Sequence, residues 1–136
     1  MLVGEYQHSL DDKGRVILPA KFREELAGAF ITSEVDGCLA MWPPEDFEVR
    51  AREMRERSRG STADRQVSRA FFARAAEASP DKQGRVAIPA TLRDFAGLGR
   101  EVVITGQFDH VEIWDAARWE RQRDAGDEAL AAGRER

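Results

Sequence analysis

The sequence predicts an α+β fold in which two repeated β-units share one core and carry helices at the periphery. Three observations support this prediction: a motif that occurs twice, β-type segments around each copy, and an arginine-rich helical segment between the copies. The chain has 136 residues, of which 42% are hydrophobic and 34% are charged. Such a chain suits one globular domain, or two small halves that share a core.

The repeated motif reads DDKGRVILPAKFR at residues 11–23 and DKQGRVAIPATLR at residues 81–93. Seven of the thirteen aligned positions are identical, including the glycine, the arginine that follows it, and the Pro-Ala pair. The match continues downstream with a two-residue insertion in the second copy, which aligns Trp42 with Trp114. A repeat of about half the chain indicates a duplicated unit, because a solenoid needs about three repeats to bury its core.

Each copy is expected to form a strand, a tight turn, a second strand and a short helix, in that order. Gly14 and Gly84 supply the positive φ that the turn requires. Pro19 and Pro89 end the second strands and suit the first turn of a helix. The predicted strands are residues 4–9, 15–18, 73–79 and 85–88, and the predicted short helices are residues 20–26 and 90–95.

A hairpin and a longer helix follow in each copy. The predicted strands are residues 30–35, 38–42, 101–106 and 111–114. Asp36-Gly37 is a favourable hairpin turn, and Asp109-His110 is a weaker one. Prolines and acidic residues at 43–46, and Asp115 as an N-cap, mark the helix starts. Two aromatic pairs have the spacing of a hydrophobic staple and are interpreted as packing residues: Trp42 with Phe47, and Trp114 with Trp119.

The segment between the copies is predicted to form two helices, divided at Gly60-Ser61-Thr62, with Ser61 or Thr62 as the cap of the second, which ends near Ala70. Residues 43–74 form the only positive block, with eight arginines against six carboxylates. We interpret this block as a solvated face with i,i+4 ion pairs, and a basic patch or subunit contact is the alternative. The predicted boundaries are 1–48 for the first repeat, 49–70 for the connector, 71–120 for the second repeat and 121–136 for a helical tail that frays from Ala125.

Composition and motifs exclude several classes of protein. The longest uncharged stretches have eight residues, so no membrane span is predicted, and the N-terminus lacks a secretory pattern. A single cysteine, Cys38, fits a reducing cytoplasm. Glycine-rich phosphate loops, CxxC and HExxH are missing, and His8, Cys38 and His110 are scattered. We therefore predict no catalytic residue, no metal site and no cofactor. The net charge of −4 argues mildly against a nonspecific nucleic-acid coat, but leaves room for a local basic site.

The duplicated turn is the main candidate site. Packing around a pseudo-two-fold axis would place Arg15 and Arg85 in equivalent turns, suited to a phosphate or to the O6/N7 edge of guanine. Asp11 and Asp81 are placed to hold each guanidinium across the turn. The same pattern also occurs as a structural staple in which the aspartate accepts turn N–H groups. The residues alone do not decide between these two interpretations.

The chain resembles the MraZ proteins of bacteria and, more distantly, the AbrB-type swapped-hairpin DNA-binding fold. The resemblance rests on GEYQHSLD at residues 4–11, on both Asp-x-x-x-Arg turns with their Val-x-[Leu/Ile]-Pro-Ala continuation, and on FFARAA at residues 71–76. It covers the chain to about Glu120. It implies two tandem swapped-hairpin β-units, packed as a pseudo-two-fold barrel with peripheral helices.

The resemblance also implies a function. MraZ proteins are regulators that bind double-stranded DNA at short G-rich direct repeats upstream of their own operon, the division and cell-wall gene cluster. It implies a cytoplasmic, nucleoid-associated ring of about eight or more chains, with no membrane or small-molecule partner. Gln83 replaces Lys13 in the second turn, which is therefore expected to bind less strongly. The implied DNA-contacting residues are Arg15, Arg85, Lys13 and Lys82, and the implied turn-orienting residues are Asp11, Asp81, Gly14 and Gly84.

Two other classes stay open at this point. A protein-interaction module of the same fold, antitoxin-like or a scaffold, would pair its arginines with acidic partner surfaces. A small enzyme is the least favoured class, because no acid–base pair or metal cluster stands out from the charged background. Repressor and activator both fit the sequence, since that outcome depends on where the DNA site lies relative to a promoter.

Overall fold

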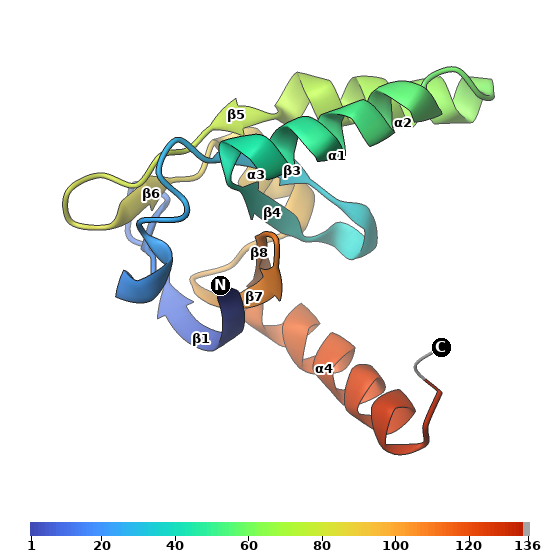
Figure 1. Cartoon of the computed structure of the whole chain (residues 1–136). Helices are drawn as coiled ribbons and strands as arrows, with labels where there is room; N and C mark the ends of the chain where they lie inside the picture. Colours follow the sequence, from blue (N-terminus) through green and yellow to red (C-terminus); the bar gives the residue numbers. More distant parts are fainter. Residues whose placement is uncertain (135–136) are drawn as a thin grey trace.

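The computed structural model describes residues 1–134, which form α-helices around β-structure (Figure 1). The strands are β1 (Leu2–Ser9), β2 (Arg15–Ile17), β3 (Phe30–Ser33), β4 (Leu39–Trp42), β5 (Ala76–Glu77), β6 (Arg85–Ala87), β7 (Glu101–Phe108) and β8 (Val111–Asp115). The helices are α1 (Pro44–Arg57), α2 (Thr62–Arg74), α3 (Ala90–Ala96) and α4 (Ala116–Ala131), with short 3-10 helices η1 (Ala20–Phe22) and η2 (Val35–Gly37). Among these residues, no helix has the length and apolar character needed to cross a membrane.

Strand pairing interleaves the two repeats. The six-stranded antiparallel sheet has the order β1-β7-β8-β4-β3-β5, and β2 pairs with β6 in a separate two-stranded ribbon. The first strand of each repeat therefore pairs with the third strand of the other repeat, and the two second strands pair with each other. If each strand is replaced by its counterpart in the other repeat, the same order is obtained from the opposite edge of the sheet. A lone hairpin is marginal in water, so each repeat gains its sheet from the other.

The sheet remains open, which corrects the closed barrel expected from the resemblance. Strands β1 and β5 are its two edges, and they do not pair with each other within residues 1–134. The physical reason is the shortness of β5, which has two residues where a strand over residues 73–79 was predicted. Helix α2 takes up the preceding residues, since it continues to Arg74 instead of ending near Ala70.

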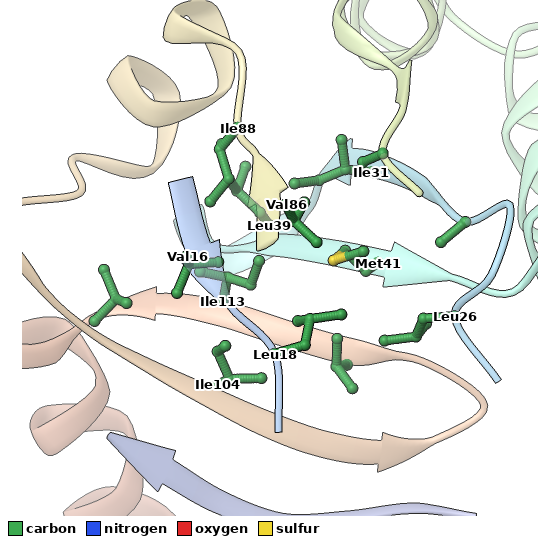
Figure 2. Close-up of a cluster of buried hydrophobic side chains, with 14 of the residues drawn as sticks. Val16, Leu18, Leu26, Ile31, Leu39, Met41, Val86, Ile88, Ile104 and Ile113 are labelled. Carbon is green, nitrogen blue, oxygen red and sulfur yellow. The ribbon is translucent and has the colours of Figure 1, made fainter. Parts of the chain in front are cut away.

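The core lies between the ribbon and one face of the sheet. Val16 and Val86 pair directly across the ribbon and are 1% and 0% exposed. Figure 2 shows these two side chains among residues of the sheet such as Leu39, Met41 and Ile113, all of which are buried. Side chains alternate between the faces of a strand. The residues before and after each valine in β2 and β6 therefore point to the outer face of the ribbon.

Helices cover aromatic residues on the opposite face of the sheet. Phe47 of α1 stacks on Phe30 of β3, with ring centroids 4.3 Å apart. The ring centroids of Trp119 in α4 and Trp114 are 5.9 Å apart, which confirms the contact expected for that staple. In the first repeat the two aromatic residues of the predicted staple stack on different rings. Phe47 stacks on Phe30, and Trp42 stacks on His110 with ring centroids 4.2 Å apart.

Two predicted helix caps have different outcomes. Ser61 caps α2 through a capping box, in which its hydroxyl accepts the Asp64 N–H at 3.1 Å and the Asp64 carboxylate accepts the Ser61 N–H. Asp115 occupies the N-cap position of α4, but its side chain makes no cap hydrogen bond. Its carboxylate instead accepts the backbone N–H of Gly99 at 3.1 Å. The loop before β7 thus competes successfully for this carboxylate.

Other boundaries also differ from the prediction. The helix expected at residues 20–26 is the single 3-10 turn η1, followed by further turns up to Gly28, which has a φ of 73°. Strands β1 and β7 are longer than predicted because they pair along their whole lengths. Helix α4 continues to Ala131, although fraying was expected from Ala125. The chain does reverse at Asp36 and Gly37, which have φ values of 67° and 81°, but the connection is residues 34–38 with η2 inside it, not the predicted two-residue turn.

Candidate nucleic-acid interface

The aspartate of each repeated turn holds the backbone of that turn together. Oδ1 of Asp11 accepts the backbone N–H groups of Lys13 and Arg15, both at 2.9 Å. The N–H of Asp11 donates to the carbonyl of Arg15 at 2.9 Å. Asp81 makes the corresponding bonds with Gln83 and Arg85, at 2.9, 2.9 and 3.0 Å. The turns therefore have the same geometry although their middle residues differ.

The second oxygen of the same carboxylate holds the arginine side chain. Nε of Arg15 donates to Oδ2 of Asp11 at 2.7 Å, and Nε of Arg85 donates to Oδ2 of Asp81 at 2.8 Å. One carboxylate thus acts both as a staple of the turn and as a partner of the guanidinium. The terminal nitrogens of both arginines, Nη1 and Nη2, donate to no residue between 1 and 134. Those nitrogens form the fork that can bind a ligand bidentately.

These carboxylates stay charged over the whole neutral range. Hydrogen bonds from the backbone N–H and the side chain of Arg15 lower the pKa of Asp11 to about 2. The equivalent bonds from Arg85 lower the pKa of Asp81. Exposed ion pairs of this kind contribute little to the stability of a fold. They do restrict the arginine side chains before binding, which reduces the entropy lost when a ligand immobilises them.

The ribbon brings both arginines onto one surface. Its register pairs Arg15 with Ala87 and Ile17 with Arg85, and paired residues point to the same face. We call these four residues the ribbon face. The two arginine side chains are 30% and 35% exposed, and Ile17 is 49% exposed. Diagonal neighbours such as the two arginines are about 7–8 Å apart between Cα atoms.

Two further arginines support the turns from inside, a role that the sequence analysis missed. Nε of Arg23 donates to the Leu18 carbonyl at 3.1 Å, and the guanidinium lies against Gly84, where an added Cβ would meet it at 2.1 Å. Arg93 lies in the equivalent place beside Gly14. The glycines are therefore required for close approach as well as for their φ values of 73° and 80°. The available signal was the identity of these arginines in both repeats.

The two predicted lysines lie on the turns but at different positions. Lys13 and Lys82 are both exposed. Lys13 directly precedes the turn glycine, whereas Lys82 lies one residue earlier in its turn, with Gln83 at the position of Lys13. The positive charge near the two ends of the ribbon is therefore unequal.

The connector arginines separate into two groups. Four of them form ion pairs: Arg50 with Glu34 at 2.7 Å, Arg52 with Glu48 at 2.7 Å, Arg57 with Asp64 at 3.0 Å, and Arg59 with Glu56 at 3.2 Å. The first of these joins α1 to the residue that follows β3 and is largely buried, whereas the pairs of Arg52 and Arg59 are exposed, as expected for a solvated face. Three others have no ion pair to any residue between 1 and 134, and they line a groove between α1 and α2 together with Phe72: Arg55, Arg65 and Arg69.

The remaining candidates for chemistry lie apart from the ribbon face. Burial raises the pKa of the Cys38 thiol, which donates to the Val35 carbonyl at 3.7 Å. A thiol of raised pKa is a poor nucleophile and a poor metal ligand. His8 lies on β1, away from Cys38 in the pairing order of the sheet. Across residues 1–134, no group of three or more His, Cys, Asp and Glu is arranged to hold a metal ion.

His110 is held between two carboxylates. Its Nδ1 lies 2.6 Å from Asp109 and its Nε2 lies 3.3 Å from Glu112. Both nitrogens can donate together only in the protonated ring. Burial of the imidazole lowers its pKa, but the hydrogen bonds and charges of Glu112 and Asp109 outweigh burial and raise the pKa above its usual value.

The contribution of His110 to the free energy of unfolding is expected to fall as the pH rises from about 6 to about 8, whereas burial lowers the pKa of His8 and gives that residue the opposite dependence. A raised pKa in the folded state means that His110 stabilises the protein fully below the unfolded pKa, and that this contribution is lost as the pH rises through the folded pKa. His110→Phe keeps a ring for Trp42 to stack on and should show a smaller dependence on pH. Urea denaturation at both pH values measures the free energy of unfolding. An equal change with pH in wild type and in the variant would contradict this prediction.

The fold and the turns together define a class of protein: a duplicated α+β unit whose two copies build one arginine-bearing β-ribbon. The chain belongs to the MraZ family. The family model described as "MraZ protein, putative antitoxin-like" matches it twice, over residues 1–70 and residues 71–136. Each match contains one copy of the repeated turn.

Named relatives match over most of their length. The transcriptional regulator MraZ of Salinispora arenicola is 49% identical over 88% of this chain and 85% of the relative. Proteins of the same name from Cutibacterium acnes and Corynebacterium diphtheriae are 45% and 44% identical. These two matches cover 96% and 97% of this chain, and 93% of each relative.

Proposed function

We propose that this chain is a DNA-binding transcriptional regulator that places its ribbon face in the major groove. The observation that carries the proposal is the ribbon register, which puts Arg15 and Arg85 on one outer surface, with Nη nitrogens that donate to no residue between 1 and 134. The major groove admits a two-stranded β-ribbon, and the arginine fork matches O6 and N7 of guanine. The relatives that carry the name transcriptional regulator support the same function.

The DNA target that we propose is a set of short G-rich direct repeats upstream of the division and cell-wall gene cluster, its own operon. Two arginines about 7–8 Å apart match about two base-pair steps of about 3.4 Å. They are too close to address half-sites that lie about 34 Å apart on one face of the duplex. One ribbon therefore reads one short element, and a series of repeats requires a series of chains.

A closed ring of about eight or more chains would provide that series. Linking many weak contacts raises the avidity without any new contact to DNA. In this proposal the arginines contact bases, Lys13 and Lys82 contact phosphates, and the turn aspartates and glycines keep the arginines in place. We keep the swapped-hairpin description, a cytoplasmic, nucleoid-associated location and the boundaries 1–48, 49–70, 71–120 and 121–136 as parts of the same proposal.

Fluorescence anisotropy tests the proposal with the duplex from upstream of the protein's own gene and a scrambled duplex of equal composition. We expect tighter binding to the native duplex, and an affinity that falls linearly on a log–log plot against salt. Light scattering at micromolar protein should give the mass of a ring. Equal affinity for the two duplexes would contradict sequence-specific recognition, and a monomer would contradict the ring.

A protein-interaction module is the second candidate function. The family description includes the term antitoxin-like, and the groove between α1 and α2 carries three arginines without ion pairs to described residues. This function predicts salt-sensitive binding to an acidic protein surface, with no preference between the two duplexes. The anisotropy comparison therefore separates the two candidates.

A further inference from the structure

We propose that Ile17 reads a thymine methyl group beside the guanine bound by Arg85, which makes it a specificity-determining residue of the ribbon face. The inference rests on the proposed function and deepens it. It starts from an apolar side chain that is half exposed and lies on the same face of the ribbon as the two arginines.

The position of Ile17 separates it from the core. Val16, its neighbour in β2, points inward and is 1% exposed, whereas Ile17 points outward and is 49% exposed. Single exposed aliphatic residues are common on protein surfaces. This one differs because it lies directly opposite Arg85 in the register and follows Arg15 by two residues, on the same face as both arginines.

The chemistry of the major groove fits this arrangement. Among the base edges there, thymine alone presents an apolar group, its C5 methyl, and apolar side chains recognise that methyl. Directly opposed residues in an antiparallel pair have Cβ atoms about 4.5–5.5 Å apart. That separation is comparable to one or two base-pair steps of about 3.4 Å. A ribbon that places Arg85 on a guanine therefore brings Ile17 to a neighbouring base pair.

The second repeat lacks an equivalent of this side chain. Ala87 occupies the position that corresponds to Ile17 and lies opposite Arg15. Its single methyl group extends less far from the ribbon than the side chain of isoleucine. We therefore place the thymine contact at the Arg85 end only. A ribbon with unequal ends suits a DNA element without internal two-fold symmetry, as in the direct repeats proposed above.

Replacement of thymine by deoxyuridine tests the inference, because it removes the C5 methyl and keeps the base pairing. Wild-type protein is expected to bind the fully substituted native duplex about fourfold more weakly per contacted methyl, the equivalent of one buried methyl group. Ile17→Ala should bind the thymine duplex more weakly by a similar factor and lose nothing further on the deoxyuridine duplex. The double-mutant comparison removes any effect of deoxyuridine on the shape of the DNA.

Val49→Ala is the matched control, because Val49 is another exposed aliphatic residue and lies on α1, outside the ribbon. It should keep the wild-type loss on deoxyuridine, and thermal melts should show that both variants are folded. An equal deoxyuridine loss in wild type and Ile17→Ala, or no loss in wild type, would overturn the thymine contact while the preference for native DNA stands. If wild type shows no preference for the native over the scrambled duplex, the proposed function itself fails.

Discussion

Replacing Arg15 and Arg85 together by alanine is expected to abolish the preference for native DNA and to leave the fold intact. Each bidentate contact to guanine contributes about 1–3 kcal/mol of discrimination, or roughly 5- to 150-fold in affinity. The two contacts are lost in every chain of the assembly, so avidity multiplies the effect. The fold should survive because, among residues 1–134, the side chain of each arginine pairs with its aspartate alone, and solvent-accessible pairs of this kind contribute about 0–1 kcal/mol.

Two further variants separate base recognition from general charge. Arg15→Lys keeps the charge but loses the planar fork, so binding through guanine predicts a loss of discrimination, whereas binding through phosphate predicts little change. Arg52→Ala removes one charge from an exposed ion pair on α1 and should bind like wild type. Wild-type discrimination in the double alanine variant would show that the turns are structural staples only.

The single variants should also rank the two turns by their contribution to DNA binding. We expect the larger loss of affinity for Arg15→Ala, because only the first turn has a lysine beside its glycine.

The parts of the site that were predictable from sequence are those that local chemistry determines. The turn forms because Asp11 accepts N–H groups two and four residues later, and Gly14 takes a positive φ. All the atoms involved lie within five residues, so the motif alone specifies them. The same reasoning predicted a cap at Ser61 or Thr62, and the structure has Ser61 in that place.

The parts that were not predictable depend on contacts between distant segments. The register that places Ile17 opposite Arg85 joins residues nearly seventy positions apart, and no local pattern encodes it. The place of Arg23 beneath Gly84 depends on the same pairing. Asp115 was predicted as a cap because capping is a local property, but the Gly99 N–H accounts for its only side-chain hydrogen bond among residues 1–134. Contacts between distant segments therefore determine the ribbon face, whereas local contacts determine the turns from which it is built.

Residues 1–70 alone are expected to be unfolded as a monomer and folded only as a dimer. In the whole chain this segment pairs β1 with β7, β2 with β6 and β3 with β5, and each of these partners lies in residues 71–136. Only the β3–β4 hairpin is complete within the first repeat, and an isolated hairpin is marginal in water. The face of Val16 and Leu18 that now packs on shared strands would be exposed to water.

A second copy of residues 1–70 can supply equivalent strands, because the two repeats occupy matching places in the strand order. Circular dichroism across a concentration series, with sedimentation equilibrium at the same concentrations, should show folding and dimerisation appearing together. Mixing with residues 71–136 should give a folded heterodimer, and the whole chain at equal concentrations is the folded control. A folded monomer of residues 1–70 would contradict the interleaved core. The ribbon face exists only where two repeats meet, so the unfolded monomer should also fail to discriminate native DNA.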